Sequence, residues 1–409
     1  MIASTLPDKI VPKSLDALRE TLERCDREGL KVSVEGGKTL SGMGPVLPRA
    51  DVALITTALS AILAHEYHDL TCSAQSGVRV AQLNAALGEH GQFIPIDVPL
   101  RKKATIGGSL AAGWPGPRRH MYGRARDFVI GSQVALADGT LANAGGMVVK
   151  NVSGYDMSKL YIGSFGTLAV FTQLNFKTLP LPKKRRAMIA PLPEATRARA
   201  IERIASLVVP PAAAFCVEGF GKNVDGADDI DGRVLLYFEG TEELLERATL
   251  DTRSALGKAG VPETTIVDTG AAESLDRTID ACIANKRGRS ITYRLFGSPG
   301  TAQERAERMR DACNRHELFT DVLFDVMNGD VFVRASERDA SHFGAKIEAC
   351  HADLRELEPR CTIVACDSVA RASFEAWGAV PPAIEKMRAM KARFDPHGTL
   401  NPGRFIGGI

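Results

Sequence analysis

The sequence has few features that would tie it to a metal cluster, a nucleic acid or a lipid bilayer. Its eight cysteines are dispersed over 409 residues and none forms a C-x-x-C pair. We therefore expect buried free thiols and no iron–sulfur cluster in this chain. The formal net charge of +2 gives no reason to expect a nucleic acid or an anionic membrane as a partner. With 44% hydrophobic and 24% charged residues, the composition is that of an ordinary globular protein.

Long apolar runs are also missing. The most apolar stretch near the N-terminus, residues 52–64, is shorter than a membrane span and is interrupted by Thr56, Thr57 and Ser60. The opening residues, MIASTLPDK, lack the basic-then-apolar plan of a signal peptide. We expect a cytoplasmic protein with no direct membrane span, placed at the inner face of the membrane only if a complex holds it there.

Common metal and nucleotide signatures are absent as well. His65, His68 and His90 do not have ligand spacing, and we expect them at the surface or at helix ends. Residues 35–42, EGGKTLSG, follow a predicted strand but fit neither the P-loop nor the Rossmann pattern. A strand followed by a glycine-rich loop can line up backbone N–H groups as an anion nest, which suits a pyrophosphate, although a plain turn is an equal alternative.

What the chain has in abundance is glycine between short strands over residues 103–177. The blocks ATIGG, GPRR, RDFVIGSQVALADG, KNVSGYD and GSFGTLAVFT follow one another in this stretch. The apolar runs 129–137 and 167–176 predict strands, and Asp138-Gly139 predicts a turn with positive φ. Glycine at this density favours a backbone that approaches a ligand closely.

These blocks resemble the FAD-binding domain of the vanillyl-alcohol oxidase type, also called PCMH-type. Within that superfamily their combination is similar to the FAD-binding E subunit of bacterial glycolate oxidase. The resemblance implies FAD as the cofactor. It also implies noncovalent FAD, because Lys38 stands in the region where relatives with covalent flavin have a histidine.

The resemblance implies a set of cofactor-binding residues in the loops that it covers. They are Gly36, Gly37, Lys38, Thr39, Leu40, Ser41, Pro99, Thr105, Gly107, Gly108, Ser109, Gly113, Tyr155, Asp156, Gly166, Val170 and Asn401. Thr105 and Ser109 can offer hydroxyl groups to the ribityl chain or phosphates. Tyr155 and Asp156 can equally form a structural hydrogen-bonded pair.

Four further residues carry a positive charge, or can gain one, near the expected flavin. Arg118, Arg119 and His120 can stabilise an anionic reduced flavin or hold a substrate carboxylate, with Arg404 as the fourth candidate. The alternative for the first three is a solvated basic corner or a contact to a partner subunit. No residue stands out as the general base, so the catalytic residues are unknown.

The remainder of the chain predicts a second domain and a return to the first. From residue 187 the order strand–helix–strand–strand–helix–strand occurs twice, which predicts a cap of two ferredoxin-like halves sharing one antiparallel sheet. Residues 394–405 resemble the closing motif D-P-x-G-x-L-N-P-G-[KR] of the family. We therefore expect an α+β protein with an FAD domain at 1–186 (subdomains about 1–98 and 99–186), a cap at 187–380 and a C-terminal return at 381–409.

The cap lacks the histidine-rich metal and substrate segment of the catalytic D-type relatives. Only Asn328-Gly329-Asp330 is present, in a predicted hairpin without flanking histidines, so no metal is expected. The resemblance implies an FAD subunit of a glycolate dehydrogenase-like complex that oxidises a 2-hydroxy acid, with a D-like catalytic flavoprotein and an F-like iron–sulfur subunit as partners. The alternatives are a self-sufficient 2-hydroxyacid dehydrogenase and a non-catalytic structural subunit.

Overall fold

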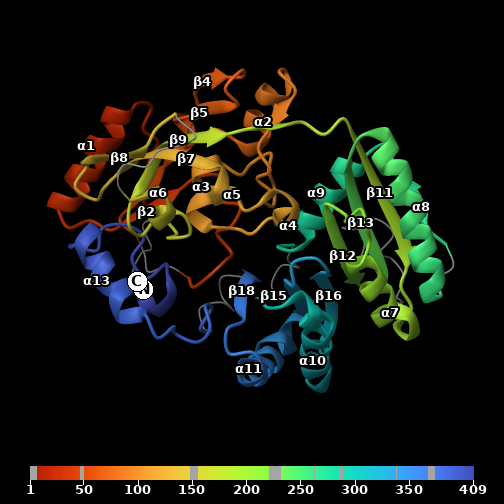
Figure 1. Cartoon of the computed structure of the whole chain (residues 1–409). Coiled ribbons are helices and arrows are strands. Elements are labelled where there is room, and N and C mark those ends of the chain that lie inside the picture. The colour runs from red at the N-terminus through yellow and green to blue at the C-terminus, as the bar shows by residue number, and fades with distance from the viewer. Residues whose placement is uncertain are drawn as a thin grey trace. The chain divides into compact units, whose positions relative to one another are not determined.

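The computed structural model shows two compact units (Figure 1). The first unit comprises Met1–Gly116, Arg124–Leu181 and Val380–Ile409, and the second comprises Pro117–Gly123 and Pro182–Ala379. The structure describes residues 7–46, 50–147, 155–220, 232–261, 263–284, 289–337, 339–366 and 374–409. The second unit thus includes a short segment, Pro117–Gly123, from the sequence predicted to belong to the FAD domain.

The first unit begins with a three-stranded parallel sheet of order β1–β3–β2. Its strands are Asp8–Ile10, Val52–Ile55 and Val32–Glu35. Helix α1, Leu15–Arg27, begins after Ser14, whose hydroxyl accepts a hydrogen bond from the Ala17 N–H at 3.2 Å and caps the helix. Leu18 and Leu22 point into the core with Val32 and Leu54, so the apolar face of α1 covers this sheet.

A second sheet of the first unit is antiparallel and has the order β4–β5–β9–β7–β8. Its strands are Ile62–Glu66, Thr71–Gln75, Val170–Lys177, Val129–Ala135 and Leu141–Gly145. The predicted turn between β7 and β8 is present, with Gly139 at a φ of 79° and the Asp138 carboxylate accepting from the Thr140 N–H at 2.9 Å.

Short elements connect and flank these sheets in the first unit. They are η1 Thr56–Ala58, α2 Val80–Gly88, β6 Gln92–Phe93, α3 Ile106–Ala112, α5 Ala125–Phe128, α6 Ser158–Tyr161, β10 Leu179–Pro180, α13 Ile384–Phe394 and η4 Ile406–Gly408. Strand β10 pairs with β6.

The C-terminal segment returns to the first sheet. Leu400 pairs in parallel with Val32, and the Asn401 N–H donates to the Val32 carbonyl at 2.8 Å. The Val32 N–H in turn donates to Thr399 O at 2.8 Å. This pairing extends the sheet beyond β2 with a segment more than 360 residues away in sequence.

The second unit contains one antiparallel sheet of eight strands, in the order β14–β11–β13–β12–β16–β17–β15–β18. Its first half consists of β11 Lys184–Pro191, α7 Glu194–Ala205, β12 Ala213–Glu218, β13 Arg233–Gly240, α8 Glu242–Ala259 and β14 Thr265–Val267. Its second half consists of β15 Ser290–Leu295, α10 Ala302–Arg315, β16 Phe319–Asp325, β17 Val331–Ser336, α11 Ala340–Leu357 and β18 Thr362–Cys366. Pairing of β12 with β16 joins the halves, so the predicted cap with a shared sheet is confirmed.

Three elements of the second unit were not predicted or differ from the prediction. Helices α4, Arg119–Tyr122, and α9, Ala271–Ala281, and the short η3, Pro299–Thr301, are additional. The Thr301 hydroxyl donates to the Ser298 carbonyl at 3.2 Å and does not cap α10. The predicted hairpin at Asn328-Gly329 is present, with Gly329 at a φ of 78°.

The positions of the cysteines and the hydropathy of the helices can be compared with what the sequence led us to expect. All eight cysteines are free thiols in buried positions. Within the described ranges, no helix combines the length and the apolar character needed to cross a membrane.

Candidate functional site

The glycine loop after β2 lies directly against the turn that begins α3. A Cβ atom on Gly37 would lie 1.9 Å from the Lys103 carbonyl oxygen, and one on Gly36 would lie 2.3 Å from Thr105 Oγ1. A side chain at Gly37 would therefore force a backbone shift, and one at Gly36 would displace the Thr105 hydroxyl. The contact brings together two of the segments in which the sequence predicts a cofactor site.

Backbone donors are concentrated in this loop. Among the described residues, the N–H groups of residues 36–40 form no hydrogen bond to a protein acceptor. Lys38 has a φ of 56°, and its ammonium group lies 2.5 Å from a Glu35 carboxylate oxygen. Consecutive unpaired N–H groups with a left-handed residue among them are typical of an anion nest. This donor set fits a pyrophosphate.

Thr105 and Ser109, whose hydroxyl groups we expected near the cofactor, both form hydrogen bonds within the first turn of α3. Thr105 Oγ1 accepts from the Gly108 N–H at 3.2 Å, and Ser109 Oγ donates to the Thr105 carbonyl at 2.7 Å. Thr105 is the N-cap of α3, and Gly113, with a φ of 64°, ends the helix. The Ser109 hydroxyl proton is thus used within the helix, and the hydroxyl oxygen can still accept a hydrogen bond.

A second glycine loop packs against the other end of α3. The N–H groups of Gly163 and Phe165 donate to Leu110 O at 2.9 Å and Ala111 O at 2.8 Å. Phe165 and Gly166 both adopt left-handed conformations, with φ values of 54° and 68°. Such a conformation is strained for phenylalanine, so surrounding contacts must hold it in place.

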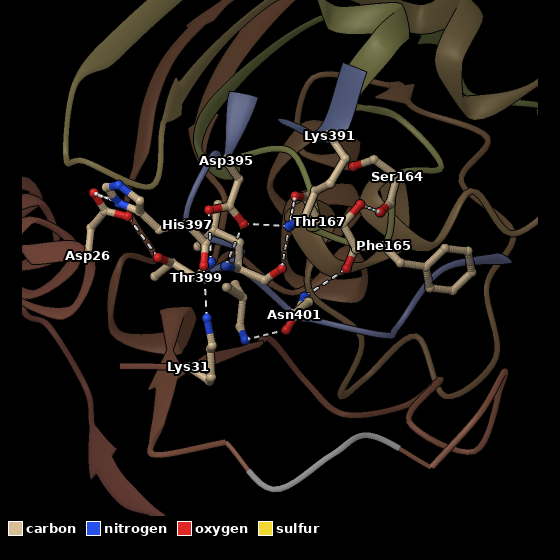
Figure 2. A network of polar contacts seen from close by, with 12 residues as sticks. Asp26, Lys31, Ser164, Phe165, Thr167, Lys391, Asp395, His397, Thr399 and Asn401 are labelled. Carbon is tan, nitrogen blue, oxygen red and sulfur yellow. Dashed lines mark hydrogen bonds and ion pairs between the residues drawn. The ribbon is translucent and has the colours of Figure 1, made fainter. Parts of the chain in front are cut away.

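Asn401 joins this second loop to the strand before the first loop (Figure 2). Its Oδ1 accepts from the Val34 N–H at 2.8 Å, and its Nδ2 donates to the Phe165 carbonyl at 2.7 Å. The residue is 4% exposed and itself has a φ of 41°. Both ends of its amide bind protein backbone, so the structure gives Asn401 a bridging position between the loops.

Arg404 also holds the first glycine loop. Its guanidinium donates to the Leu40 carbonyl at 3.1 Å and to the Pro45 carbonyl at 3.3 Å, and it lies 5.7 Å from the centre of the Phe165 ring. The residue is buried. A guanidinium that donates to two backbone carbonyls fixes the end of the loop, and this position does not favour a substrate contact.

The remaining predicted cofactor residues differ in how far they are exposed to solvent. Pro99 is buried in the loop before α3, Val170 is buried at the start of β9, and Thr39 is partly exposed. Tyr155 is 93% exposed, and the Asp156 carboxylate lies 3.6 Å from Lys159 Nζ. A hydrogen-bonded Tyr155–Asp156 pair is not seen. The KNVSG block at 150–154 lies outside the described residues.

One residue near the loops was missed by the sequence reasoning. Ser76, which follows β5, is 1% exposed, and its Oγ has no hydrogen-bond partner among the described residues. A Cβ atom on Gly107 would lie 2.7 Å from the Ser76 Cβ. A buried hydroxyl without a partner is costly, so this donor beside Gly107 fits a site that receives a polar ligand. A lone serine in a strand–helix connection gives no sequence signal.

Arg118 lies in the second unit, where its charge is opposed. Its Nη1 lies 2.9 Å from Glu239 Oε1, and the same carboxylate accepts from Arg185 Nε at 2.8 Å and from the Tyr122 hydroxyl at 2.7 Å. Burial would raise the pKa of Glu239, but these partners outweigh it and hold the pKa below its usual value. Only 11% of the Arg118 side chain is exposed, so a solvated basic corner is wrong for this residue.

Arg119 and His120 also have partners within the second unit. Arg119 Nη1 lies 2.8 Å from Asp330 Oδ2, and Arg294 Nη2 lies 2.8 Å from the other oxygen of that carboxylate. The His120 Nε2 atom lies 2.7 Å from the Pro211 carbonyl, and burial lowers the pKa of His120. The side chains of the predicted cationic cluster are therefore bound to acceptors within the second unit, and each of the two carboxylates is shared by two guanidinium groups.

The hairpin next to Arg119 contains a buried carboxylate. Asp325 Oδ1 accepts from the N–H groups of Met327 and Asn328 at 2.9 and 3.0 Å. Its Oδ2 accepts from the Asn328 side chain at 2.8 Å. Burial raises the pKa of Asp325 to about 7, although the hydrogen bonds from Asn328 and the charge of Arg119 act in the opposite direction. Among the described residues, no group of three or more His, Cys, Asp or Glu could hold a metal ion.

The glycine loops and the sheets of the first unit agree with a family match. Residues 9–145 match the model of the FAD binding domain family. The chain contains an FAD-binding domain. The anion nest at 36–40, the glycine contacts and the unpaired Ser76 hydroxyl are compatible with this cofactor.

Curated relatives support the same class of protein. The chain is 26% identical to glycolate oxidase subunit GlcD of Bacillus subtilis (strain 168), over 98% of this chain and 89% of the relative. It is 33% identical to glycolate oxidase subunit GlcE of Escherichia coli (strain K12), over 41% of this chain and 47% of the relative. It is 28% identical to D-lactate dehydrogenase of Archaeoglobus fulgidus, over 59% and 56%. These matches place the chain among FAD-dependent oxidoreductases.

Solved structures share the fold. Substrate-bound p-cresol methylhydroxylase aligns with a TM-score of 0.74 and 14% identity, covering 97% of this chain and 88% of the other. Alkyldihydroxyacetonephosphate synthase aligns with a TM-score of 0.69 and 14% identity, covering 96% and 76%. The α+β fold, with a PCMH-type FAD-binding domain and an antiparallel cap, is thereby confirmed.

We predict that Gly37→Ala lowers the affinity for FAD by about tenfold or more, since the new methyl group would force the loop off the Lys103 carbonyl. The measurement is the dissociation constant from quenching of FAD fluorescence. Gly88→Ala is the matched control, because a Cβ atom there would meet nothing within 4 Å. Equal affinities of the two variants would show that the tight contact is irrelevant to the cofactor.

We predict that the stability of the second unit falls as the pH rises from about 4 to about 7 because of Asp325. A raised pKa means that the folded state binds more protons than the unfolded state over this window, so the contribution of Asp325 is fully present below it and lost above it. Asp325→Asn should remove up to about 4 kcal/mol of this pH dependence.

The measurement is the thermal unfolding midpoint of the full chain between pH 5 and pH 8, with the exposed Asp311→Asn as the control. Parallel curves for wild type and Asp325→Asn would mean that the N–H donors keep Asp325 ionised throughout.

Proposed function

We propose that this chain is the FAD-binding subunit of a glycolate dehydrogenase-like complex that oxidises glycolate or a related 2-hydroxy acid to the 2-oxo acid. In this proposal the subunit resembles the E type of glycolate oxidase. Its partners are a D-like catalytic flavoprotein and an F-like iron–sulfur protein, which receives the electrons.

The similarity to glycolate oxidase subunits supports the substrate class. GlcD and GlcE are named as subunits of glycolate oxidase, and D-lactate dehydrogenase acts on another 2-hydroxy acid. The identity to GlcE is higher, but it covers only 41% of this chain. A role as one subunit among several follows from both names and belongs to the proposal.

The observation that carries the accessory role is the pairing of Arg118 and Arg119 with buried carboxylates. Oxidation of a 2-hydroxy acid needs a cation to hold the carboxylate and a base to take the hydroxyl proton. Both guanidinium groups are opposed by buried carboxylates, Glu239 and Asp330, in the second unit. A substrate carboxylate would have to displace one of these carboxylates. This supports a substrate site in a partner subunit.

The residues of the first unit support a binding role for the cofactor. The N–H groups of residues 36–40 would hold the pyrophosphate, and Arg404 fixes the end of that loop through the Leu40 carbonyl. Asn401 sets the spacing between β2 and the 163–168 loop. Bound FAD would supply the two-electron acceptor, held noncovalently, that this chain's side chains lack.

A self-sufficient FAD-dependent 2-hydroxyacid dehydrogenase is the second candidate. The observation in its favour is the alignment with GlcD, which covers 98% of this chain and 89% of the relative. In that case Arg118, Arg119 and His120 would form the substrate site, and the substrate carboxylate would have to displace Glu239 from Arg118 or Asp330 from Arg119.

We predict that the isolated chain, purified with FAD and kept anaerobic, retains its oxidised-flavin absorption when glycolate or D-lactate is added. The reason is that both candidate substrate-binding arginines are paired. Acetate, which lacks the hydroxyl group, is the control for effects of the carboxylate alone. Dithionite provides the fully reduced reference spectrum.

Each alternative has its own result in this experiment. Bleaching of the flavin bands by a hydroxy acid but not by acetate would establish the self-sufficient dehydrogenase. Unchanged bands support the accessory subunit, and reduction on adding a D-like partner would complete that case. A chain that folds but binds no FAD would be a structural subunit, and the proposal would fail.

A further inference from the structure

Lys391 lies near the end of α13 with its ammonium group surrounded by acceptors (Figure 2). Its Nζ donates to the Thr167 carbonyl at 2.7 Å and to the Leu400 carbonyl at 2.9 Å, and it forms an ion pair with Asp395. An ammonium group has three protons, and each has an acceptor here. Only 13% of the side chain is exposed.

Asp395 is the acidic partner in this arrangement. It is 1% exposed and accepts from the N–H groups of Thr399 and Leu400, each at 2.8 Å. Burial lowers the pKa of Lys391, and the Asp395 carboxylate acts in the opposite direction. A buried ion pair with every donor and acceptor satisfied fixes geometry more than it stabilises a fold.

The two carbonyls that Lys391 binds are adjacent to the residues of the Asn401 bridge. Thr167 directly follows Gly166, and Leu400 directly precedes Asn401. Asn401 Nδ2 binds the Phe165 carbonyl on the other side of Gly166. Lys391 and Asn401 therefore hold the two sides of Gly166, where Phe165 and Gly166 are both left-handed. The ammonium also fixes the turn from which Asn401 reaches across.

A further contact ties the same turn to the first helix. The Thr399 hydroxyl donates to Asp26 Oδ1 at 2.7 Å, and His397 Nδ1 lies 3.0 Å from Asp26 Oδ2 (Figure 2). Lys31 Nζ donates to the His397 carbonyl at 2.8 Å. The turn 395–401 is thus anchored to α1 independently of Lys391. Removing Lys391 should release the 163–168 loop while leaving the turn attached.

We propose that Lys391, supported by Asp395, is a positioning residue that holds the 163–168 loop in the conformation that accepts FAD. The inference rests on the proposed function in one respect, namely that this loop contacts the cofactor. Lys391 touches neither substrate nor flavin in this proposal. It acts through the carbonyls of Thr167 and Leu400.

The main test uses the full chain with Lys391→Met combined with Asp395→Asn, which removes both charges together. The single Lys391→Met variant would leave a buried carboxylate unpaired, and such a loss is strongly destabilising. We expect the double variant to bind FAD at least about tenfold more weakly, because hydrogen bonds from a charged donor to the loop are lost. Arg393→Met, an exposed cation on the same helix, is the matched control.

Two readouts separate positioning from a general role in stability. The first is the FAD dissociation constant together with the visible spectrum of the bound flavin, and the second is the thermal unfolding midpoint of the apoprotein. Positioning predicts weaker binding and an altered spectrum in a folded double variant, whereas a general role in stability predicts a lower apoprotein midpoint with unchanged binding and spectrum. Unchanged binding and spectrum in a folded double variant would overturn the proposal.

A second variant keeps the test decisive if the double variant fails to fold. Lys391→Arg retains the charge opposite Asp395, but a planar guanidinium cannot direct three donors from one nitrogen. We expect a folded protein with weaker FAD binding. Wild-type affinity in Lys391→Arg would overturn the positioning role, whereas a wild-type chain that binds no FAD would overturn the proposed function and this inference together.

Discussion

The organisation of the first unit depends on one side chain, the amide of Asn401. It donates to the Phe165 carbonyl and accepts from the Val34 N–H, so a single residue near the end of the chain sets the distance between two loops. The first loop follows β2, and its N–H groups at 36–40 have no acceptor within the described part of the chain; the second loop contains two consecutive left-handed residues. Arg404 holds the first loop through the Leu40 carbonyl, Lys391 holds the second through the Thr167 carbonyl, and Asn401 connects the second loop to β2, which leads into the first loop. The return of the C-terminal segment to β2 is therefore a condition for the cofactor site as well as for the sheet.

Much of this architecture can be predicted from the sequence because the local signals agree with the fold. The Asp138-Gly139 turn and the hairpin at Asn328-Gly329 each require particular residue types, and each is found where the pattern places it. The strand–helix–strand–strand–helix–strand order, which occurs twice in the cap, can also be recognised from local sequence patterns. Helix α9 is a miss, because nothing in the predicted ferredoxin-like pattern called for another helix after β14.

The candidate site is less predictable because its key contacts are remote in sequence. Motif resemblance identifies Asn401 and Arg404, but the carbonyls that they bind, Phe165 and Leu40, carry no side-chain signal. The partners of Arg118 and Arg119 lie more than 100 residues away, at Glu239 and Asp330. In a sequence, two arginines near a glycine indicate positive charge that could bind a ligand. Whether that charge is available depends on burial and on acids elsewhere in the chain.

The placement of residues 117–123 in the second unit has a consequence for how the two units could evolve or be engineered. Glu239 and Asp330 belong to the cap sheet, yet part of their counter-charge is encoded within the first domain's stretch of sequence. A cap excised at 182–379 would leave both carboxylates with fewer cations around them. The cap is thus not an interchangeable module: exchanging it between homologous chains requires the seven-residue segment Pro117–Gly123 to travel with it.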